Sequence, residues 1–144
     1  MKYSWAAVLV ALALAVTYLL RAWPMINIVE TGRTPEYPDV VPRAYPVSLD
    51  RVYDAALHAV QRLPRWSLVT FRQEAGEIET EARTLVLRFV DDVRIRIEPT
   101  GVQTMVSVRS ASRVGRGDFG QNARNIRMFF EELDRQIAVS ASGH

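Results

Sequence analysis

Cysteine is absent from the chain, which excludes disulfides, thiolate metal sites and a cysteine nucleophile. Histidine occurs only as His58 and His144, which argues against a histidine-based metal site or a catalytic triad. One of the 18 basic residues is a lysine, Lys2, and the formal net charge is only +2. A charge this small does not indicate a nucleic-acid partner. We therefore expect no metal, no cofactor, no catalytic residue and no bound nucleic acid.

Charged residues are also missing between Ser4 and Leu20. A helix of this length spans roughly 26 Å, close to the thickness of a bilayer core. Aromatic residues, which prefer the membrane–water interface, flank both ends of the run: Tyr3, Trp5, Tyr18 and Trp23. Residues 1–23 are therefore predicted to form one transmembrane anchor in the lipid bilayer.

A cleaved secretory signal peptide is the competing interpretation of this segment. The "ALA" triplets at 11–13 and 13–15 resemble a cleavage site, but the apolar run continues through Val16, Leu19 and Leu20. We favour an uncleaved anchor. Because the two sides of the span carry nearly equal numbers of basic residues, the sequence specifies the orientation of the span only weakly. We expect a single-pass protein of the bacterial inner membrane with its soluble domain in the periplasm.

Proline divides the rest of the chain. Residues 24–47 contain Pro24, Pro35, Pro38, Pro42 and Pro46, and this composition predicts an extended linker. The same segment could instead lie along a partner's surface. Residues 48–139 are predicted to form one α+β domain, and residues 140–144 a disordered tail.

Hydrophobic periodicity predicts the elements of that domain. A helix runs from the N-cap Ser48 to Pro64, and strands follow at 66–72 and 77–83. Leu85, Leu87 and Phe89 continue the second strand after a bend, Asp91-Asp92 forms a turn, and two more strands occupy 93–98 and 102–108. A last helix covers 121–138. If the strand instead continued through the aspartates, Asp91 would point into the core and need a partner. The expected fold is a two-layer α+β arrangement, helix–four-stranded antiparallel meander–helix, preceded by one transmembrane helix.

Two stretches, "FVDDVRIRIEP" and "VSVRSASRVGRGDFGQNARNI", resemble the domain-of-unknown-function family numbered 1499. The matching positions are Phe89, Asp91, Asp92, Arg109, Ser110, Ser112, Arg113, Gly115, Asp118, Gly120 and Asn122. The resemblance covers about residues 45–138. It implies a fold and a location behind a signal, lipoprotein or membrane anchor, but no reaction. Of these three, lipoprotein anchoring does not apply to this chain, because it has no cysteine.

The second stretch is the candidate site. Its residues and their possible partners are Asp91, Asp92, Arg109, Ser110, Ser112, Arg113, Arg116, Asp118 and Asn122. As a structural clamp, Arg109 and Arg113 would pair with Asp91 or Asp92, and Asp118 would cap the last helix. As an anion site, Arg113 and Arg116 would converge with the two serines and the amides of 117–121. A serine hydrolase would need a base, and His58 is a poor candidate.

These observations favour a non-enzymatic accessory or assembly subunit of a larger membrane complex, which would bind other integral membrane subunits. The distribution of the resembled family, in bacteria and photosynthetic eukaryotes, suggests respiratory or photosynthetic complexes. The alternative is a periplasmic domain that binds an anion or small ligand at the 109–122 corner.

Overall fold

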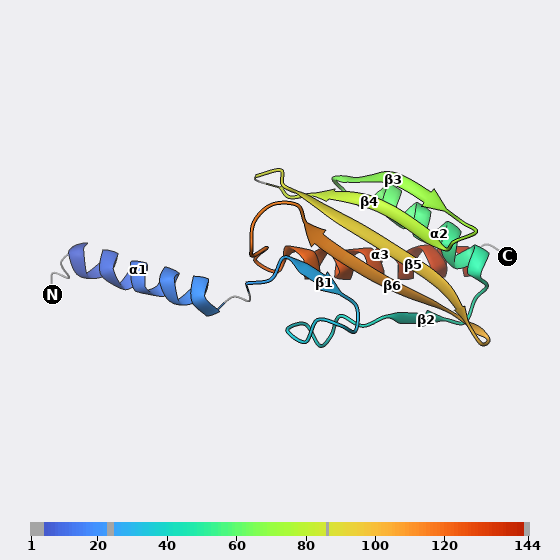
Figure 1. Ribbon diagram of the computed structural model, residues 1–144, viewed down its shortest axis with the longest axis horizontal. Helices are drawn as coiled ribbons and strands as arrows, with labels where there is room; N and C mark the ends of the chain where they lie inside the picture. The colour runs from blue at the N-terminus through green and yellow to red at the C-terminus, as the bar shows by residue number, and fades with distance from the viewer. Residues whose placement is uncertain (1–4, 23–24, 86, 143–144) are drawn as a thin grey trace.

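The structure is a computed structural model that describes residues 5–22, 25–85 and 87–142 (Figure 1). Its first element, helix α1 (Trp5–Ala22), stands away from the rest of the chain and has no buried residue. It is long and apolar enough to cross a membrane, a test that a signal sequence also passes. Because none of α1 is buried, it is not a core helix of the domain that follows.

The domain is built on a six-stranded antiparallel sheet. Its strands are β1 (Ile28–Glu30), β2 (Arg43–Tyr45), β3 (Trp66–Arg72), β4 (Glu77–Arg83), β5 (Val90–Thr100) and β6 (Gln103–Ser112). The spatial order is β1-β6-β5-β4-β3, and β2 pairs with the same edge of β6 further along. The four strands expected from the sequence are therefore present, with two short strands added at one edge.

Those two added strands correct the prediction of a free linker over 24–47. Val29 in β1 and Tyr45 in β2 are buried in the core, and the Thr31 amide donates to the Val108 carbonyl at 3.0 Å. The prolines at 35, 38 and 42 lie in the connection between the strands, where no ladder hydrogen bond is lost. Proline spacing signalled an extended chain correctly, but two three-residue edge strands carry too few residues to show a period.

Two helices cover one face of the sheet, as Figure 1 shows: α2 (Leu49–Arg62) and α3 (Gln121–Ser142). Apolar residues at helical spacing, including Val52, Ala56, Ile126 and Leu133, are buried against Ile95 and its neighbours on the sheet. Ser48 occupies the N-cap position of α2, although its side chain makes no capping hydrogen bond. The coarse prediction, an apolar N-terminal helix followed by an α+β domain, is confirmed.

The connection between β4 and β5 differs from the prediction. The expected turn at Asp91-Asp92 is wrong, because both residues belong to β5. The chain turns instead over residues 84–89, where the Thr84 amide donates to the Phe89 carbonyl at 2.9 Å. Leu85 and Leu87, expected to face the core, are exposed loop residues. The alternation of apolar residues in this loop imitates a strand.

The other end of the chain is also more ordered than expected. Helix α3 continues through residues 140–142, which were predicted to be a disordered tail. Residues 143–144 lie outside the described range.

Candidate functional site

The candidate site is the corner between β6 and α3, and an aspartate begins the helix there. Asp118 Oδ1 accepts from the Gly120 amide at 2.9 Å, and Oδ2 accepts from the Asn122 amide at 2.7 Å. A carboxylate at this position satisfies free amides and lies favourably near the positive end of the helix dipole. Gly120 has φ +76°, a left-handed conformation that favours glycine. This is the capping role expected of Asp118.

Behind the cap lies a buried network of polar side chains. Ser110 Oγ donates to Asn122 Oδ1 at 2.5 Å, and Asn122 Nδ2 donates to Ser112 Oγ at 2.8 Å. Asn125 Nδ2 donates to Asp91 Oδ2 at 2.8 Å and lies 3.2 Å from Ser110 Oγ. Ser110, Asn122, Asn125 and Asp91 are all buried. Amide side chains thus contact both serines, and Ser112 also hydrogen-bonds to the Asp91 carboxyl.

Asn125 is the residue of this network that sequence reasoning missed. It lies three positions after Asn122 on α3 and therefore on the same side of the helix. The available signal was the pair of asparagines at this spacing, each followed directly by an apolar residue, Ala123 or Ile126.

The network also holds the start of the domain. The Ser112 amide donates to the Asn27 carbonyl at 2.8 Å, and the Asp118 amide donates to the Ile26 carbonyl at 3.1 Å. The Asn27 side chain donates to the Gly115 carbonyl at 2.8 Å, and Asn122 Nδ2 lies 3.0 Å from the Asn27 carbonyl. The corner therefore binds the segment that directly follows α1, which the sequence did not reveal.

Asp91 is the buried acid of the site, with 2% of its surface exposed. Burial raises its pKa, and the nearby charges of Asp118 and Asp92 act in the same direction. Hydrogen bonds from Ser112 and Asn125 oppose that rise. The carboxyl is therefore harder to ionise in the folded protein than in the unfolded chain.

This raised pKa predicts a specific pH dependence for Asp91→Asn. Below pH 3.8, the ordinary value, Asp91 is protonated in both states and its charge costs nothing. As the pH rises, the unfolded chain ionises first, so the wild type loses stability until the folded pKa is passed. We expect the melting temperature of the variant, relative to wild type, to rise by a few degrees from pH 3 to pH 7. A difference in melting temperature between variant and wild type that stays constant across this pH range would contradict the raised pKa of Asp91.

The arginines of the corner divide between two places. Arg113 Nε lies 3.1 Å and 3.0 Å from the two oxygens of Asp92, and Arg113 Nη2 lies 2.6 Å from both Asp92 Oδ1 and Glu81 Oε1. These contacts join the neighbouring strands β4 and β5 to the start of the corner on the solvent face, so the expected pair of Arg113 with Asp92 is confirmed. Arg116 is exposed, and its side chain has no partner within the described residues.

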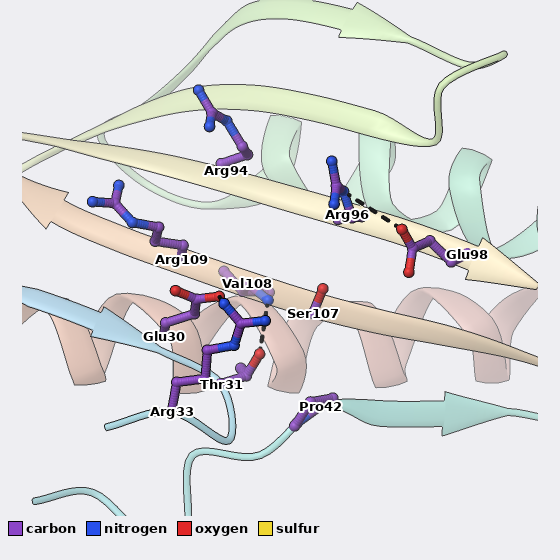
Figure 2. A pocket seen from close by; sticks show the side chains of 10 residues that line it. All are labelled: Glu30, Thr31, Arg33, Pro42, Arg94, Arg96, Glu98, Ser107, Val108 and Arg109. Carbon is purple, nitrogen blue, oxygen red and sulfur yellow. Dashed lines mark hydrogen bonds and ion pairs between the residues drawn. The ribbon is translucent and has the colours of Figure 1, made fainter. Parts of the chain in front are cut away.

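The predicted pairing of Arg109 with Asp91 or Asp92 is wrong. Arg109 lies opposite Arg94 in the ladder, on the solvent face, whereas Asp91 points to the helices. Arg109, Arg94 and Arg33 line a hollow of 350 Å³ on that face, and Figure 2 shows how these side chains lie. Arg94 and Arg33 pair there with Glu79 and Glu30, respectively. Side chains alternate between the two faces of a strand, and the even-numbered residues of β6 face the core. Arg109 is odd-numbered and therefore lies on the solvent face.

The two arginines form a matched pair for mutation. Arg113→Ala removes contacts with two carboxylates, so we expect the melting temperature to fall by a few degrees at low salt and by less at high salt. Arg109→Ala removes no ion pair within the described chain and should leave the melting temperature unchanged. Equal effects of the two substitutions would contradict the proposed clamp.

A groove of 530 Å³ opens beside the network. It lies between the 84–89 loop and the 113–120 loop, and Asp91, Ser112 and Asp118 line its polar part. Apolar side chains form much of its remaining lining: Leu85, Leu87, Phe89, Val114 and Phe119. The predicted anion site is not assembled here, because Arg113 is occupied by carboxylates and the groove lining holds two aspartates against one arginine, Arg124. The arrangement suits an apolar body with a hydrogen-bond donor at one end.

Residues 17–133 match a protein family described as "Protein of unknown function (DUF1499)". The chain belongs to this family. The match begins within α1 and includes the whole segment first interpreted as a linker, in agreement with the packing of β1 and β2 on the domain. In this DUF1499 domain, the residues that carry the family resemblance serve mainly in the buried network, the helix cap and the Arg113 contacts.

A search of curated proteins finds no match. Two solved structures are similar to the chain. One is a crystal structure of a Thermus thermophilus protein, with 11% identity, a TM-score of 0.44 and coverage of 80% of this chain and 99% of that one. The other is a Chromobacterium violaceum protein, with 11% identity, a TM-score of 0.40 and coverage of 82% and 99%.

Proposed function

We propose that the protein is a non-enzymatic accessory or assembly subunit of a larger membrane complex, anchored by α1 in the bacterial inner membrane. Its domain would lie at the periplasmic surface. The observation that carries this proposal is the short connection between anchor and domain. Ala22 ends α1, and Ile26 is already hydrogen-bonded to the corner through the Asp118 amide. A domain tied so closely to a membrane span stays within reach of proteins in the same bilayer.

The sequence of α1 offers a surface for another helix. Ala7, Ala11 and Ala15 are spaced by four residues and therefore share one side of the helix. Small residues at this spacing let transmembrane helices approach closely. This pattern supports an integral membrane protein as the partner.

Affinity purification from native membranes in a mild detergent tests the proposal. We expect the tagged full chain to co-purify with an integral membrane protein in fixed stoichiometry. Ala11→Leu should weaken that association, whereas Ala13→Leu, on another side of α1, should not. A chain that migrates alone after mild extraction would count against a role as a subunit.

The groove supports a second candidate function, the binding of a small ligand. Its polar part holds two aspartates against one arginine, Arg124, and together with the apolar lining this favours an amphipathic amine or alcohol over an anion. Thermal-shift measurements can compare an alkylamine with the carboxylate of equal chain length. Stabilisation by the amine alone is the expected result for this function, and the absence of any shift argues against it.

A further inference from the structure

Exposed apolar side chains gather at one end of the domain, on the two loops that border the groove. Leu85, Leu87 and Phe89 come from the 84–89 loop, and Val114 and Phe119 from the 113–120 loop. Leu85 and Leu87 are 73% and 67% exposed. Single exposed apolar residues are common, but a cluster on adjoining loops indicates a surface that meets an apolar partner. We call these five residues the apolar rim.

The two loops that carry the apolar rim lie at the end of the domain nearest α1, as Figure 1 shows. Met25 lies next to Gly117 on the 113–120 loop, so close that a Cβ atom added to Gly117 would crowd the Met25 side chain. Only three residue steps separate Met25 from Ala22, the last residue of α1, so their Cα atoms are at most about 11 Å apart. If α1 spans the bilayer, the 113–120 loop is therefore beside the membrane–water interface.

Basic residues surround the apolar rim. Arg88 lies within the 84–89 loop, Arg116 within the 113–120 loop, and Arg124 in the first turn of α3, and all three are exposed. The neighbouring acids are less available, since Asp91 is buried and the Asp118 carboxylate binds the amides of α3. Exposed arginines next to apolar side chains suit a membrane surface that carries anionic lipids.

We propose that the apolar rim inserts into the headgroup region of the bilayer, with Arg88, Arg116 and Arg124 contacting anionic lipid headgroups. The domain then touches the membrane directly, in addition to its anchor. This inference rests on the proposed anchoring by α1, which brings the apolar rim to the lipid surface. It also gives Arg116, which has no partner within the described chain, a binding role.

The absence of cysteine makes the inference directly testable by site-directed spin labelling of the full chain. Single cysteines at Leu87 and Val114 report on the two loops, and one at Leu12 reports on the anchor. Val102, in the β5–β6 turn at the opposite end of the domain, is 97% exposed and is the matched control. The variants are reconstituted in nanodiscs of phosphatidylcholine and phosphatidylglycerol, which contain lipid and no other integral protein.

We expect labels at Leu87 and Val114 to become more accessible to oxygen and less accessible to an aqueous nickel chelate, as lipid-inserted labels do. The Leu12 label should show this shift most strongly, and the Val102 label should stay accessible to the chelate. If Leu12 is deep but both loop labels remain accessible to the chelate, the inference is overturned, the anchor stands, and the rim becomes a surface for a protein partner. If the Leu12 label is also accessible to the chelate, the proposed anchoring fails as well.

Discussion

Asn122→Ala is expected to lower the free energy of unfolding by about 3 kcal/mol, because it leaves several buried polar groups without partners. The wild-type side chain accepts from Ser110 and donates to Ser112 and to the Asn27 carbonyl. None of its surface is exposed, so water cannot replace these bonds in the intact fold. Urea denaturation of the detergent-solubilised chain, followed by far-UV circular dichroism, measures the change.

Arg124→Ala provides the matched control for this substitution. Arg124 lies on the same turn of α3, is exposed, and among the described residues donates only to its own neighbours, the Phe119 carbonyl and the Gln121 side chain. Its replacement should change the free energy of unfolding by no more than about 0.5 kcal/mol. If Asn122→Ala were equally mild, the network would not be what holds the corner together.

The double substitution Leu12→Arg/Leu14→Arg is expected to release the protein from the membrane. Two arginines at the centre of a span cost about 5 to 7 kcal/mol on an insertion scale, whereas the remaining aliphatic residues of α1 contribute about −2 to −4 kcal/mol. The chain should therefore move from the membrane pellet to the soluble fraction after an alkaline carbonate wash. Immunoblotting of the two fractions measures this redistribution.

Leu12→Ile/Leu14→Ile keeps the span apolar and should leave the protein in the pellet. Retention of both double variants would mean that α1 is not what holds the chain to the membrane. The contact would then have to come from another part of the molecule.

The sequence predicted the strands whose alternation is strict. In β4, Ile78, Thr80 and Ala82 face the core as expected, because a half-buried strand imposes a period of two. The capping by Asp118 and the pairing of Arg113 with Asp92 were also predictable, because each depends on chemistry that is local or specific to the residue type. Strands β1 and β2 were not, since a three-residue strand carries no measurable period.

Asp91 shows why the site was only partly predictable. An aspartate pair favours a turn, and that local preference suggested a break in the chain. The structure overrides it with a partner far away in sequence, Asn125, which makes burial of the carboxyl acceptable. The binding of residues 26–27 by the corner was hidden for the same reason, because no local pattern reports a contact across most of the chain.

The intact mass of the chain from carbonate-washed membranes tests the central claim, that the domain is held at the membrane by a retained α1. We predict a membrane-bound species whose mass includes all of Trp5–Ala22. A soluble species that begins just after Ala13 or Ala15 would contradict the account, because α1 would then be a signal peptide and the domain would leave the membrane.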